Sequence, residues 1–167
     1  ALKAQVKPAK ATVADALADG QRLMSGAGRD PRAAAQAFRE AAVLDRTQAA
    51  AWLRLAETLL MTVPDPQKAQ ERAELASQAT SAAMRGIEMA QNAADKAGGL
   101  HLLHEALKRR GMYRPAINAL KASVALADVA ERRTLLTQLI AEHGFRIVDT
   151  KVDADATQPR ACVVFSE

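Results

Sequence analysis

The chain has 167 residues, of which 49% are hydrophobic, 25% charged and only 3% aromatic, as in a folded globular domain and unlike a disordered chain. The net charge is +4, and the basic residues are mostly interleaved with acidic ones. The sequence lacks the basic face and the stacking aromatic residues of nucleic-acid-binding proteins, so we expect no nucleic-acid partner. No apolar run approaches the ~20 residues of a membrane span, so we expect no membrane insertion.

Capping residues and helix breakers divide residues 12–144 into helices, after a leader (1–11) that we expect to be flexible. Thr12, with an acid three residues later, has capping-box spacing, and Asp30-Pro31 combines an N-cap with a proline at the first helical position. Thr47 is expected to cap a third helix, and Val63-Pro64-Asp65-Pro66 to end it and cap the next. With Ser25–Gly28 and His143-Gly144 as stop signals, the expected helices are two that end near Met24 and Leu44, then Gln48–Met61, a long helix reaching about Gln91, Ala97–Arg110, Pro115–Leu126 and one from about Ala130 to His143.

After Gly144 the hydrophobic period changes from that of a helix to that of a strand. Phe145 and Ile147 alternate with polar residues, 153–159 has the composition of an acidic turn, and 160–166 alternates again. Residues 145–167 therefore predict a short C-terminal β-hairpin, which alone is marginally stable in water. The expected fold class is all-α, with antiparallel helix pairs in a superhelix and this hairpin as a tail.

The helical part carries a repeat. Its copies are Ala34-x3-Phe38-x2-Ala41, Trp52–Leu59, Leu100-x2-Leu103-His104-x2-Leu107 and Ala116-x3-Leu120-x2-Ser123. These segments match the pattern W-x2-L-G-x2-Y followed by A-x3-F-x2-A, which has a period of 34 residues in the tetratricopeptide family. Residues 12–144 resemble this family, with about three repeats and a closing helix; a generic alanine-rich helical bundle is the alternative. Phe38 and Leu120 are 82 residues apart, which is two periods plus 14, and we place the surplus as an insertion around residues 61–76.

The tetratricopeptide resemblance implies a concave surface lined by the first helix of each pair. Such a groove would hold a peptide or a partner protein. The set of Lys and Asn residues with which family members clamp a C-terminal carboxylate is not recognisable, and a solvated face without a ligand is the alternative. The positions that the resemblance places in the groove are Leu53, Glu57, Leu60, Met61, His101, Glu105, Lys108 and Arg109.

Catalytic and metal-binding patterns are weak. His101 and His104 are close enough on a helix to share a metal, which is the basis of a rival enzyme hypothesis, but no third ligand is evident and two ligands hold zinc poorly. Ser25 and His143 lack the context of a nucleophile elbow, and Gly26-Ala27-Gly28 lacks the later Gly-Lys-Ser/Thr of a phosphate loop. We therefore expect no enzyme activity, cofactor or metal.

The segment after Gly144 carries a second resemblance. Gly-Phe-Arg-Ile-Val-Asp, Val-Asp-Ala-Asp and Pro-Arg-Ala-Cys-Val-Val-Phe-Ser-Glu resemble the junction in bacterial alpha-2-macroglobulin-family proteins at which helical repeats give way to the first macroglobulin domain. The resemblance implies a non-catalytic interaction or spacer module of a protease-trapping protein (an endopeptidase inhibitor) in the periplasm or cell envelope. Its partners would be other domains of the same chain or a protease, and Cys162 would find its disulfide partner beyond residue 167. The alternative is a free-standing cytoplasmic tetratricopeptide adaptor that binds peptides or partner proteins.

Overall fold

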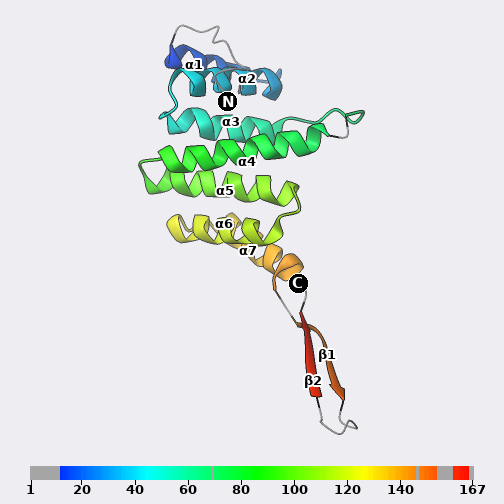
Figure 1. Ribbon diagram of the computed structural model, residues 1–167. Helices are drawn as coiled ribbons and strands as arrows, with labels where there is room; N and C mark the ends of the chain where they lie inside the picture. Colours follow the sequence, from blue (N-terminus) through cyan, green and yellow to red (C-terminus); the bar gives the residue numbers. More distant parts are fainter. Residues whose placement is uncertain (1–11, 69, 146, 154–159, 166–167) are drawn as a thin grey trace.

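The computed structural model describes residues 12–68, 70–145, 147–153 and 160–165, so the expected leader and most of the expected acidic turn lie outside the described residues. The fold is mostly helical and ends in a two-stranded hairpin, which confirms the fold class predicted from the sequence (Figure 1). Within the described residues the elements are α1 (Val13–Met24), α2 (Pro31–Leu44), α3 (Ala49–Met61), α4 (Glu71–Met89), α5 (Ala93–Arg109), α6 (Tyr113–Leu126), α7 (Ala130–His143), β1 (Ile147–Asp153) and β2 (Arg160–Phe165).

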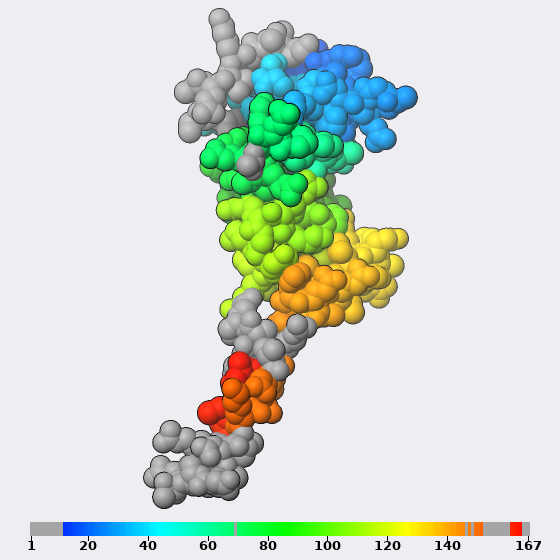
Figure 2. Space-filling view, turned by 90° about the vertical axis from the view of Figure 1, so that its right-hand side faces the viewer, coloured from blue at the N-terminus to red at the C-terminus, as the bar shows by residue number. Residues whose placement is uncertain are grey.

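The helices stack in chain order. Each helix packs against its neighbours in the sequence, and α3 also contacts α5 across the edge of α4. Figure 2 shows the result from the side as a column whose colours follow the sequence from one end to the other. The first helices of successive pairs are therefore α1, α3 and α5, and α7 closes the series.

The middle pair is longer than its neighbours. The first residues of α3 and α5 are 44 residues apart, against 36 for α1 and α3 and 37 for α5 and α7. The extra length lies in the connection 62–70 and in the 19 residues of α4. This position agrees with the insertion expected around residues 61–76.

Two predicted N-caps are confirmed and two are wrong. The side chains of Thr12 and Asp30 each accept a hydrogen bond from the backbone N–H three residues later, at 3.1 and 2.9 Å. Thr47 does not cap α3, because its hydroxyl and its N–H both donate to the Asp45 carboxylate, at 2.7 and 2.8 Å. The helix instead begins after Gln48, without a side-chain cap. The Val63–Pro66 stretch lies in the connection, and α4 begins only at Glu71.

Helices α5 and α6 begin earlier than predicted. Asn92 caps α5 by accepting from the N–H of Asp95 at 2.8 Å, and the Gly98-Gly99 pair lies inside the helix. Pro115 is the third residue of α6, still within the first turn, where a missing N–H costs no helical hydrogen bond. At the end of α7, Gly144 occupies the C-cap with extended backbone (φ −74°), so it is not a left-handed C′ glycine.

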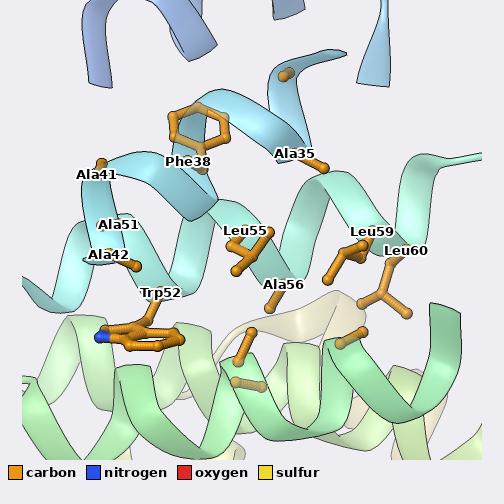
Figure 3. Packing of buried hydrophobic residues seen from close by; sticks show 14 of the residues in the cluster. Ala35, Phe38, Ala41, Ala42, Ala51, Trp52, Leu55, Ala56, Leu59 and Leu60 are labelled. Carbon is orange, nitrogen blue, oxygen red and sulfur yellow. The ribbon is translucent and has the colours of Figure 1, made fainter. Parts of the chain in front are cut away.

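The core is built from alanines with a few large side chains between them. Phe38 of α2 is 1% exposed and its ring lies against Gly20 of α1, where an added Cβ would be 2.6 Å from Phe38 Cε1. Trp52 of α3 is buried in the same cluster (Figure 3). Its indole N–H donates to the carbonyl of Arg46 at 2.9 Å. A second, smaller cluster joins α5, α6 and α7 around Leu120 and Leu139. Leu103 packs against both clusters.

The hairpin extends away from the helical column (Figure 1). β1 and β2 are antiparallel, with Thr150 opposite Val163 and Lys151 opposite Cys162. The side chains of Ile147, Val163 and Val164 are exposed, as is the thiol of Cys162. Apart from their mutual pairing, the strands leave apolar surface open to solvent.

Candidate functional site

A pocket of about 340 Å³ lies between α3, α5 and the beginning of α7. These are successive first helices of the pairs, the helices that the tetratricopeptide resemblance assigns to the concave surface. The pocket is partly open to solvent. Its lining comprises Ala50, Leu53, Arg54 and Glu57 from α3, Ala94, Asp95, Gly98, His101 and Leu102 from α5, and Arg132 from α7.

Three of the eight residues assigned to the groove from the sequence line this pocket, namely Leu53, Glu57 and His101. Leu60 does not face a groove: it is 8% exposed and belongs to the main core cluster. Its neighbours Thr58 and Leu59 are buried as well.

The other four residues of the sequence-based groove lie beyond the pocket. Met61 is 43% exposed at the end of α3, and Arg109 is exposed at the end of α5. Glu105 and Lys108 lie on α5 between the pocket residue Leu102 and Arg109, with 3.9 Å between Lys108 Nζ and Glu105 Oε1. They share the helices of the pocket but not its lining.

Glycines shape the pocket floor. Leu53 lies against Gly86 of α4 and Gly99 of α5; an added Cβ would be 2.7 Å from Leu53 Cγ at Gly86 and 2.9 Å from Leu53 Cδ2 at Gly99. A Cβ on Gly98, by contrast, would meet no atom within 4 Å. Gly86 and Gly99 thus let the three helices approach closely around Leu53. Gly98 lines the same pocket as Leu53, and its missing side chain leaves open space there.

Three of the charged lining residues have partners at the pocket edge. Arg54 Nη1 is 2.8 Å from Glu57 Oε2, in an exposed i,i+3 pair of the kind that contributes little to stability. The Asp95 carboxylate accepts from the Asn92 side-chain amide at 2.8 Å, within the N-terminal cap of α5. These contacts leave both carboxylates neutralised or hydrogen-bonded.

Arg132 is held by a buried serine. The hydroxyl of Ser123, on α6, donates to the carbonyl of Ala97 on α5 at 2.7 Å and accepts from Arg132 Nη1 at 3.2 Å. Ser123 is completely buried, so this relay links α5, α6 and α7 beneath the pocket. Among the residues that the structure describes, no carboxylate lies within 4.0 Å of the Arg132 guanidinium.

Both histidines belong to α5; His104 is buried and His101 is partly buried. Burial lowers the pKa of His101 below its usual value, and the positive charges of a protonated His104 and of Arg132 lower it further. Burial also lowers the pKa of His104, whose ring is fully buried. His101 Nδ1 and His104 Nε2 are buried without hydrogen-bond partners, although His104 Nε2 lies 3.6 Å from Glu105 Oε1. The lowered pKa values favour the neutral form of both rings at pH 7. In the described part of the chain, no three His, Cys, Asp or Glu side chains gather so that they could hold a metal.

Sequence reasoning missed Arg132, Ser123 and Asp95. Groove positions were transferred only to the two clearest first helices, whereas the closing helix continues the same series and contributes Arg132. The relay through Ser123 joins residues that are 26 and 9 positions apart, a placement that only the packed structure reveals.

None of the described helices has the length and apolarity needed to cross a membrane. A scan of protein-family models finds no match to this chain, and a search of curated proteins finds none either.

Proposed function

We propose that this chain is a non-catalytic protein-interaction module that binds a peptide segment of a partner in the pocket between α3, α5 and α7. The observation that carries the proposal is the pocket itself, which combines an aliphatic floor at Leu53 and Leu102 with charged groups at its edge. Apolar pockets with a few placed polar groups are the usual form of a binding site, and about 340 Å³ lies in their normal size range of ~300–1,000 Å³. Its position on successive first helices favours an extended ligand that follows the column.

The chemistry of the lining supports a binding role over a catalytic one. The ten residues around the pocket include no Ser, Thr, Cys, Lys or Tyr that could act as a nucleophile. The two carboxylates of the lining are already engaged, Glu57 by Arg54 and Asp95 by the side-chain amide of Asn92.

For the wider context, we propose that the helix pairs are tetratricopeptide-like and that the module belongs to a bacterial alpha-2-macroglobulin-like protease-trapping protein of the cell envelope. The support is the residue pattern of 145–167, together with a hairpin that extends from the column with exposed apolar side chains. Strands of this kind suit a sheet formed outside the helical column. A free-standing adaptor is the alternative, and the sequence of the gene downstream of codon 167 decides between them.

Peptide display tests the binding function. Random peptides are selected on the wild-type chain and then measured against Gly98→Leu, whose side chain fills the pocket while improving helix propensity. Gly28→Leu is the matched control, because Gly28 lies in an exposed connection with open space around it.

We expect the selected peptides to bind the wild type and Gly28→Leu equally and Gly98→Leu at least about ten-fold more weakly, since one occluded apolar contact is worth ~1–3 kcal/mol. Selected peptides that bind Gly98→Leu as well as the wild type, or a selection that yields no binder, would contradict the proposed function.

A further inference from the structure

We propose that the pocket recognises a carboxylate on its ligand through Arg132, beside an aliphatic group that packs on Leu53 and Leu102. This inference rests on the proposed function and specifies the chemistry of the ligand.

The guanidinium of Arg132 is fixed in place before any ligand arrives. Arg132 is the third residue of α7, and its Nη1 donates to Ser123, which is itself bonded to the α5 carbonyl of Ala97. An arginine has five N–H donors in a rigid planar fork, and this contact uses one of them. The side chain is partly buried, so little conformational freedom is left to lose when a ligand binds.

The pairing of the other charges leaves Arg132 as the cation available to a ligand. Arg54 and Glu57 form a pair with each other, and Asp95 accepts from Asn92. Arg132 is the lining cation that has no carboxylate partner among the described residues, and a carboxylate can take two parallel N–H donors from such a fork. A doubly charged phosphate would also meet the fields of Glu57 and Asp95, which oppose it.

The floor determines what accompanies the carboxylate. Leu53 and Leu102 provide aliphatic surface, and Gly98 leaves room above them. Burying an aliphatic side chain there is favourable by ~1.5–3 kcal/mol at full burial. The ligand is therefore either an acidic residue next to an aliphatic one or a chain that ends in an aliphatic residue with a free carboxylate.

Small probes distinguish these two sources. N-acetyl-leucine presents a terminal carboxylate, the α-methylamide of N-acetyl-glutamate presents a side-chain carboxylate, and N-acetyl-leucinamide is the neutral control. Each is titrated into the ¹⁵N-labelled full chain while the backbone amides of Gly98 and His101 are followed by NMR. The variants are Arg132→Gln and, as a matched control, Arg133→Gln; Arg133 is the next residue on α7, pairs with Asp128 at 3.0 Å and does not line the pocket.

We expect at least one carboxylate probe to shift both amides in the wild type and in Arg133→Gln, with a dissociation constant about ten-fold or more higher in Arg132→Gln. The carboxylate probe that binds more tightly shows whether the pocket recognises a chain terminus or an acidic side chain. Binding of N-acetyl-leucinamide as tight as that of both carboxylate probes, or the absence of a shift with every probe, would overturn carboxylate recognition.

A second readout does not depend on ligand. Arg132→Gln removes one of the charges that lower the pKa of His101, so this pKa should rise in Arg132→Gln and stay unchanged in Arg133→Gln. An unchanged pKa of His101 in Arg132→Gln would show that the guanidinium does not lie at the pocket.

The failures of the two proposals are distinguishable. Peptides from the display experiment that bind Arg132→Gln as well as the wild type but lose binding to Gly98→Leu would refute the carboxylate and leave the binding function intact. Peptides that remain bound to Gly98→Leu refute the function itself.

Discussion

Three glycines provide a quantitative test of how closely α3, α4 and α5 pack. A Cβ added at Gly99 would lie 2.6 Å from Ile87 Cγ1 and 2.9 Å from Leu53 Cδ2, and one added at Gly86 would lie 3.2 Å from the backbone nitrogen of Leu53. At Gly98 the same atom would meet nothing within 4 Å. Replacement of these glycines by alanine should therefore stabilise the protein at one position and destabilise it at the other two.

The magnitudes follow from two opposing effects. Alanine in a helix interior is better than glycine by about 0.5–1 kcal/mol, and Gly98→Ala should gain this in full. Overpacking of a core by one methyl group costs ~1–3 kcal/mol, so Gly99→Ala should lose about 0–2 kcal/mol net. Gly86→Ala should fall at the upper end of that range, because its contact includes main chain, which moves less easily than a side-chain end.

Urea unfolding followed by circular dichroism measures these differences, and thermal unfolding should show them as shifts of roughly 2–4 °C per kcal/mol. The comparison of Gly98→Ala with Gly99→Ala is internally controlled, since the two residues are adjacent in one helix. Equal stabilisation by both substitutions would refute the close approach of α3 and α4 to α5.

Phe38→Ala should lower the free energy of unfolding by ~3–5 kcal/mol because the ring is buried between α1 and α2, and unchanged thermal unfolding would contradict its role as a repeat core residue. Burial lowers the pKa of His104 below the unfolded value of ~6.5. The contribution of the neutral ring to stability is therefore present at pH 7.5 and is lost progressively as the pH falls below ~6.5. The urea midpoint of unfolding should decrease over this pH range, and it should decrease less in His104→Gln. The hydrogen bond from the Arg32 guanidinium lowers the pKa of Glu71, which also accepts from the N–H of Asp65. Glu71→Gln should therefore be less stable than the wild type at neutral pH. This difference in the free energy of unfolding should vanish as the pH falls below the unfolded pKa of ~4.3 and Glu71 becomes protonated. A difference that persists at pH 2 would contradict this coupling.

The helix order was predictable because its signals are local. Thr12 and Asp30-Pro31 mark helix starts through contacts within four residues, and the structure places α1 and α2 accordingly. The start of α5 was misplaced by four residues because the cap at Asn92 was not recognised, although Asn92 and Asp95 have the same local spacing as Thr12 and Asp15. The glycine at 99 inside this helix is explained only by tertiary packing, because Leu53 of another helix pair occupies the space that a side chain would need.

The site was only partly predictable for the same reason. Transfer of repeat positions placed Leu53, Glu57 and His101 on one surface, and the structure has all three in the lining of one pocket. It also placed Leu60 there, although periodicity along α3 carries no information about where the neighbouring helices cover it. Arg132 depends on Ser123 and therefore on the docking of three helices, which no local pattern encodes.

The division of the apolar interior into two clusters has a consequence for how the protein opens. In a linear array each unit is stabilised by its neighbours alone, so parts with fewer buried contacts open at lower free energy. The cluster around Leu120 and Leu139 is the smaller one and should exchange its amide hydrogens sooner than the helices around Phe38. The pocket has α3, a helix of the larger cluster, at one wall and Arg132 of α7, a helix of the smaller cluster, at another. A ligand held by both walls would be lost whenever α7 opens, so by linkage its binding must slow hydrogen exchange in α7 and make the column unfold more nearly as one unit.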